Sequence, residues 1–145
     1  MAKQPGSTFR LAVCVCALFC ATAARAADPR ERIERVVSDL KTQLSIAQTV
    51  NVAVVADNPR LFSVTPAEHQ PGTFLLSVEE DFAQGLNDAE LRAAVAHELG
   101  HVWIFTHFPY LQTEQLANDI ASRVVSRETL TPLYEKVWKA RTPSR

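Results

Sequence analysis

Two histidines four residues apart constrain this chain more than any other feature of its sequence. His97 and His101 fall within residues 88–105, where apolar periodicity predicts a long helix. Asn87 can cap its start and Pro109 bounds its end. Side chains four apart on a helix share a face, with Cβ atoms about 5–6 Å apart. Two imidazoles at this spacing can converge on one Zn²⁺ ion, which binds nitrogen at about 2.0–2.1 Å.

Glu98 adds a second functional group to the same helix. It lies about 100° around the helix from His97, too far to join the two histidines easily as a ligand. It can instead reach a water on the metal and take its proton as the water attacks a carbonyl. Glu98 also borders the apolar stripe of Leu91, Val95, Leu99 and Val102, where a carboxylate is costly unless it is paired or functional. We therefore expect Glu98 to be a catalytic general base.

The third protein ligand has two candidates, of which His107 is the first. It follows His97 by ten residues, the spacing of the H-E-x-x-H-x-x-G-x-x-H motif of metzincins. That motif needs a glycine where this chain has Ile104, and metzincins also carry a methionine turn. The only methionine here is Met1. Both departures weaken this interpretation.

Glu114 is the favoured candidate. Glu114, Ala117, Asn118 and Ala121 share one face of a helix that Thr113 can cap and that we expect to run to about residue 139. The two alanines allow close approach to the histidine helix. Glu114 would then complete a His₂Glu set, and Asn118 could hydrogen-bond a ligand histidine. Alternatively, Glu114 is simply an acidic residue that favours a helix N-terminus.

Hydrolysis of an amide would also need a donor to the oxyanion. His107, Tyr110 and Tyr134 are candidates, although each is also explained by a structural role.

The first 26 residues have the pattern of a signal peptide. Lys3 and Arg10 precede an apolar run over residues 11–20, and Ala24-Arg25-Ala26 resembles a cleavage site. The alternative is an uncleaved anchor. Cleavage would leave 119 of the 145 residues, with a formal charge of −4 because three cations and no acids are removed. All three cysteines would also be lost, so a metal site must use histidines and carboxylates.

The remaining chain, residues 27–145, predicts one α+β domain. A first helix is expected over residues 29–46, with Asp28 as cap and Pro29 in its first turn. Strands are expected at 50–56, 61–65 and 73–78, followed by a short helix at 79–86. We expect these strands to form a small, mostly antiparallel sheet packed against the His97–His101 helix and the C-terminal helix that bears Glu114.

This arrangement resembles the gluzincin peptidases, most nearly the minigluzincins and the catalytic core of the CAAX prenyl protease and HtpX-type families. The likeness covers roughly residues 50–125 and is specific around 91–121. It implies zinc at His97, His101 and Glu114, with Glu98 as base. Two departures stand out: the gap from His101 to Glu114 is short, and Asn118 replaces the Asp of many relatives.

The sequence thus predicts an exported zinc metallopeptidase, periplasmic or extracellular, that acts on a peptide or protein. The alternative is a non-catalytic binding module that zinc stabilises, which the small size would suit. An acidic mature chain does not favour nucleic acid as a partner. No membrane association is expected after signal cleavage, and the sequence does not fix an oligomeric state.

Overall fold

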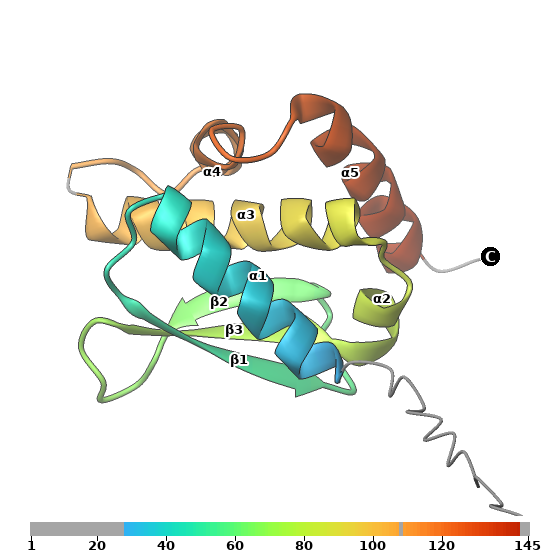
Figure 1. Ribbon diagram of the computed structural model, residues 1–145, viewed down its shortest axis with the longest axis horizontal. Coiled ribbons are helices and arrows are strands. Elements are labelled where there is room, and N and C mark those ends of the chain that lie inside the picture. The colour runs from blue at the N-terminus through green and yellow to red at the C-terminus, as the bar shows by residue number, and fades with distance from the viewer. Residues whose placement is uncertain (1–27, 108, 143–145) are drawn as a thin grey trace, which may run out of the picture.

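The computed structural model describes residues 28–107 and 109–142, which form five helices and three strands (Figure 1). The elements in chain order are α1 (Pro29–Gln43), β1 (Thr49–Val55), β2 (Phe62–Pro66), β3 (Thr73–Glu79), α2 (Glu80–Gln84), α3 (Asp88–Thr106), α4 (Glu114–Ala121) and α5 (Arg127–Arg141). The predicted α+β class is confirmed. Asp28 caps α1 and Pro29 is its first residue, as predicted. The predicted signal segment lies outside the described residues.

The three strands form one mixed sheet in the order β1-β3-β2. β2 and β3 make an antiparallel hairpin in which Phe62 pairs with Val78. β1 pairs with β3 in parallel, from Thr49 opposite Thr73 to Val55 opposite Glu79. The expected sheet was mostly antiparallel, whereas in the structure the pair β2–β3 is antiparallel and the pair β1–β3 is parallel. The cause is the path of the chain. After β1 the chain crosses to the other edge of the sheet and forms β2, and it then turns back to place β3 between β1 and β2.

Helix α3 is the centre of the molecule. It contacts α1, β2, α4 and α5, and Figure 1 shows α4 on the side of α3 away from the sheet. Its N-terminus carries a full capping box, in which Asn87 and Glu90 each bond the backbone of the other. The predicted apolar stripe is buried on this helix, at Leu91, Val95, Leu99 and Val102. A rigid, capped and buried helix thus carries both histidines.

Helices α1 and α3 contact each other and cover one face of the sheet. Leu76 and Val78 of β3 point into this core and are fully buried, whereas Leu75 on the other face is 37% exposed. In the described part of the chain, no helix has the length and apolar character needed to cross a membrane.

The C-terminal region differs from the expected single helix, because α4 ends at Ala121 and α5 begins at Arg127. The Ser122 hydroxyl donates to the Asn118 carbonyl oxygen at 2.7 Å where α4 stops. The turn that follows packs Val124 and Val125 against the core. Burial of these two valines thus favours a turn over one continuous helix. The turn directs α5 back onto α3.

Candidate metal centre

The structure brings His97, His101 and Glu114 together. The two imidazoles project from successive turns of α3, and their Nε2 atoms lie 3.3 Å apart. Glu114, the first residue of α4, places Oε2 at 3.1 Å from Nε2 of His97 and Oε1 at 3.6 Å from Nε2 of His101. Within the described residues, these three make up the group of His, Cys, Asp and Glu side chains that can share a metal ion.

The spacing of these atoms fits a tetrahedral metal ion. Ligand atoms with bonds of about 2.0–2.1 Å lie about 3.3 Å apart at tetrahedral angles. The two Nε2 atoms are 3.3 Å apart, while Nε2 of His97 lies 3.1 Å from Oε2 of Glu114 and Nε2 of His101 lies 3.6 Å from its Oε1, so all three separations are close to this value. Two nitrogens and one carboxylate oxygen leave a fourth position for a water or a substrate. The Glu114 side chain is 79% exposed, so the group is accessible from solvent on this side.

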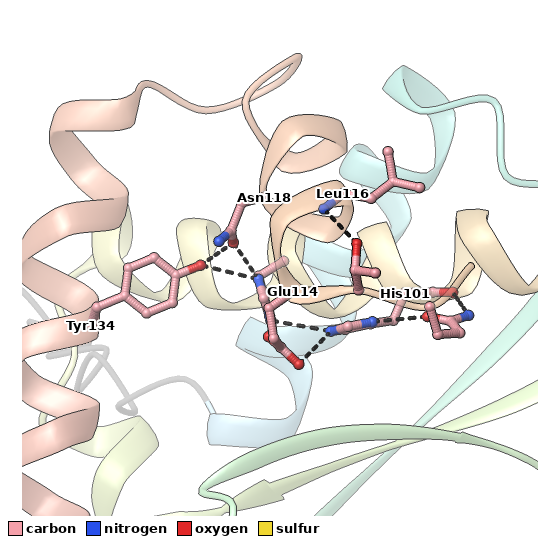
Figure 2. Close-up of polar contacts among 8 residues, drawn as sticks. His101, Glu114, Leu116, Asn118 and Tyr134 are labelled. Atoms are coloured by element: carbon pink, nitrogen blue, oxygen red, sulfur yellow. Dashed lines mark hydrogen bonds and ion pairs between the residues drawn. The ribbon is translucent and has the colours of Figure 1, made fainter. Parts of the chain in front are cut away.

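Each histidine is held by an amide from outside α3. Nδ1 of His97 lies 2.7 Å from Oδ1 of Asn118, the contact expected from the sequence. Nδ1 of His101 lies 3.0 Å from Oε1 of Gln112, whose Nε2 in turn donates to the His101 carbonyl oxygen at 3.1 Å. An amide oxygen at Nδ1 favours the tautomer with its proton there, which leaves Nε2 free to bind a metal. Figure 2 shows Asn118 and His101 within this group, with Glu114 directed toward His101.

The ionisation of His97 also suits a ligand. Burial lowers the pKa of His97 below its ordinary value, against the opposing effect of the Asn118 hydrogen bond. The imidazole is therefore neutral at pH 7, with a lone pair available on Nε2.

A close contact between α3 and α4 positions Glu114. A Cβ atom added at Gly100 would lie only 2.5 Å from the Ala117 carbonyl oxygen and 3.0 Å from the Ala117 Cα. The two backbones thus touch where both side chains are minimal. Ala117 and Ala121 are fully buried here, in agreement with the predicted close approach. Glu114 precedes Ala117 by three residues and is thereby held one turn from the contact.

Glu98 lies beside this group but faces the sheet. It is 8% exposed, and burial raises its pKa to about 7. The charge of His101 and a hydrogen bond from the Val64 backbone in β2 oppose this rise, while the charge of Glu114 adds to it. The carboxyl is therefore poised to change protonation near neutral pH.

The other candidates are placed differently. His107 ends α3 outside the metal-binding group: it stacks on Trp103 at 3.7 Å and bonds the Trp103 carbonyl oxygen through Nδ1. Helix α3 continues through Ile104, so no break swings His107 toward His97. The Tyr110 ring packs near Trp103. Of the three proposed oxyanion donors, Tyr134 is the one that reaches a ligand histidine, with its hydroxyl 3.1 Å from Nδ1 of His97.

Two contributors were not predicted from the sequence. Gln112 lies in the loop before α4, where no periodicity marks it. Gly100 carries a clear signal in retrospect, because a glycine inside a strong helix usually marks a close approach.

No family model and no curated protein matches the chain. Among solved structures, the chain is similar to the crystal structure of the metallopeptidase zymogen abylysin from Pyrococcus abyssi, with a TM-score of 0.53 and 15% sequence identity. The similarity covers 74% of this chain and 93% of that chain. At this identity it shows the fold alone. The chain thus shares the α+β fold of that structure, and on it a His-His-Glu group lies at metal-binding distances.

Proposed function

We propose that this chain is a zinc metalloendopeptidase of gluzincin type, in which His97, His101 and Glu114 bind Zn²⁺ and Glu98 is the general base. The observation that carries the proposal is that His97, His101 and Glu114 each offer one ligand atom within 4.8 Å of the other two, and that the two Nε2 atoms are 3.3 Å apart, as at a tetrahedral ion. Two imidazoles and one carboxylate are a ligand set of catalytic zinc sites, whereas structural sites are usually closed by four protein ligands.

Zinc, when bound, supplies the Lewis acidity that polarises a peptide carbonyl and activates water at neutral pH. The residues of the chain hold and move the proton. Glu98 accepts a proton from the attacking water as the new C–O bond forms at the carbonyl carbon. It then returns this proton to the amide nitrogen as the C–N bond breaks. Burial raises the pKa of Glu98 to about 7 in the metal-free chain, and a bound Zn²⁺ would lower it and so favour the carboxylate that accepts the proton.

The proposal is tested by Glu98→Ala. The variant should retain one zinc per chain, because Glu98 is not a ligand, and should lose cleavage of casein by about 10²-fold or more. His69→Ala, in the exposed loop between β2 and β3 and outside the metal-binding group, is the control and should cleave as the wild type does. A Glu98→Ala variant that cleaves as fast as the wild type would refute the assigned mechanism.

The alternative is a binding module that zinc stabilises without catalysis. It predicts bound zinc and a fourth protein ligand, with no turnover on peptide libraries. Within the described residues, His107 is turned toward Trp103 and does not supply that ligand. This placement favours the enzyme, and X-ray absorption of the zinc-loaded protein would count the ligands directly.

Export through residues 1–26 is part of the proposal and rests on their sequence. Mass spectrometry of the secreted protein should find Ala27 at its N-terminus. A full-length chain retained in the cell membrane would instead support the anchor.

A further inference from the structure

The two ligand histidines depend on neutral amides, and an amide supports a metal ligand only in one orientation. Its oxygen accepts the Nδ1 proton, whereas a flipped amide would present its NH₂ group and favour the tautomer that has its proton on Nε2. That tautomer cannot bind a metal through Nε2. Gln112 avoids the flip through its own second bond, in which Nε2 donates to the His101 carbonyl oxygen at 3.1 Å.

Asn118 is held differently, by a residue from another helix. The Tyr134 hydroxyl reaches from α5 and donates to Oδ1 of Asn118, the same oxygen that accepts from His97 (Figure 2). The hydroxyl oxygen also lies 3.1 Å from Nδ1 of His97, where it can share the imidazole proton. In this arrangement Oδ1 of Asn118 accepts both the Nδ1 proton of His97 and the Tyr134 proton. A flipped amide would instead donate to Nδ1 and to the hydroxyl oxygen, which would leave the Tyr134 proton without an acceptor in this group.

We propose that Tyr134 is a positioning residue for the metal centre: it fixes the orientation of the Asn118 amide and so holds His97 in its metal-binding tautomer. This inference rests on the proposed zinc site. It differs from the oxyanion-donor role for which Tyr134 was one of three candidates in the sequence, because the hydroxyl is directed at Asn118.

The test uses an Asn118→Asp background. Both oxygens of a carboxylate accept hydrogen bonds, so a flip of this side chain changes nothing. Tyr134→Phe should weaken zinc binding about 10-fold, the lower end of the range for a residue that supports a ligand. In an Asn118→Asp background, the same Tyr134→Phe change should have no effect on zinc affinity. Tyr110→Phe is the matched control, since it removes the hydroxyl of a ring that packs near Trp103 and should leave affinity unchanged.

Competition with a chromophoric chelator measures zinc affinity for the full set of variants. The ¹⁵N shifts of His97 in the metal-free protein give a second readout, since Tyr134→Phe should raise the fraction protonated on Nε2. A loss of affinity that is equal in the wild-type and Asn118→Asp backgrounds would show that Tyr134 acts only through packing of α5, and would overturn the proposal. Unchanged affinity with a reduced kcat at saturating zinc would also overturn it, in favour of an oxyanion donor.

Failure of this inference is separable from failure of the proposed function. If the wild-type chain binds no zinc, the metal centre itself is wrong. If it binds zinc through His97, His101 and Glu114 but Tyr134→Phe binds equally well, the positioning role alone is refuted.

Discussion

The contact between Gly100 and Ala117 makes the position of Glu114 sensitive to a single methyl group. In Gly100→Ala, the new Cβ would lie 2.5 Å from the Ala117 carbonyl oxygen, whereas ordinary contacts begin near 3.4 Å. The obstructing atoms belong to the α4 backbone, so no side chain can rotate away. Helix α4 must therefore move by about 0.9 Å to restore normal contact. Metal sites tolerate deviations of only about 0.2 Å in ligand distance.

The expected effect on stability is small, because two terms oppose each other. Overpacking costs about 1–3 kcal/mol, while alanine in place of a helical glycine contributes about 1 kcal/mol. The net loss of about 0–2 kcal/mol should lower Tm by no more than roughly 8 °C. Zinc affinity is the more sensitive quantity, and we expect it to fall at least 10-fold because Glu114 leaves its position while both histidines stay.

The experiment compares Gly100→Ala with Gly85→Ala by chelator competition and thermal unfolding. Gly85 is the matched control, since its added Cβ would meet its nearest atoms at 3.5 and 3.6 Å and its φ is −75°. Gly85→Ala should keep wild-type zinc affinity. If Gly100→Ala binds zinc as tightly as the wild type and has a higher Tm, then helix propensity dominates and the close approach does not position the ligand.

Three further predictions concern the metal ligands, the buried Glu98 and the ion pair between Lys136 and Glu90. Glu114→Ala should lower zinc affinity at least 10-fold, whereas His107→Ala should leave stoichiometry and affinity unchanged; the reverse result would restore the metzincin ligand set. In the metal-free protein, burial raises the pKa of Glu98 from 4.5 to about 7, so ionising this carboxyl costs folding free energy. The wild type should therefore lose stability as the pH rises from 4.5 through 7, whereas Glu98→Gln should not. Urea unfolding should then find the variant more stable by up to about 3 kcal/mol. Lys136→Met should cost up to about 1 kcal/mol at pH 7, because hydrogen bonding to Lys136 holds the pKa of Glu90 below its ordinary value. That difference should fade as the pH falls below 4.5 and Glu90 takes up a proton, and a cost that is constant with pH would contradict it.

Local sequence patterns predicted most of the helices and strands. They also singled out His97, His101 and Glu114, the three side chains that the structure brings together. The capping signals at Asp28 and Asn87 gave the correct starts of α1 and α3. The i, i+4 spacing placed His97 beside His101, and the small residues around Ala117 predicted the approach of α4. These features depend on neighbours within a turn or two of helix, where sequence spacing and spatial distance are closely linked.

Features that depend on distant parts of the chain were not predictable in this way. Parallel pairing of β1 with β3 depends on where β2 lies, which no local pattern specifies. The turn between α4 and α5 exists because Val124 and Val125 reach the core, a contact that helical periodicity does not reveal. The role of Tyr134 follows from this turn, since a continuous helix would not bring α5 back toward Asn118.

The burial of Glu98 separates the two functions considered for this fold. A carboxyl with its pKa raised to about 7 costs up to about 3 kcal/mol when ionised, a large share of the roughly 5–15 kcal/mol that stabilises a small domain. A site that only binds a metal for stability would gain nothing from such a residue, since His97, His101 and Glu114 would supply the ligands without it. A hydrolase does gain, because a desolvated carboxyl beside the open metal position is the base its reaction needs. The same measurement of Glu98→Gln against pH therefore bears on function: a cost near zero would remove this argument for catalysis and leave the binding module as the simpler account.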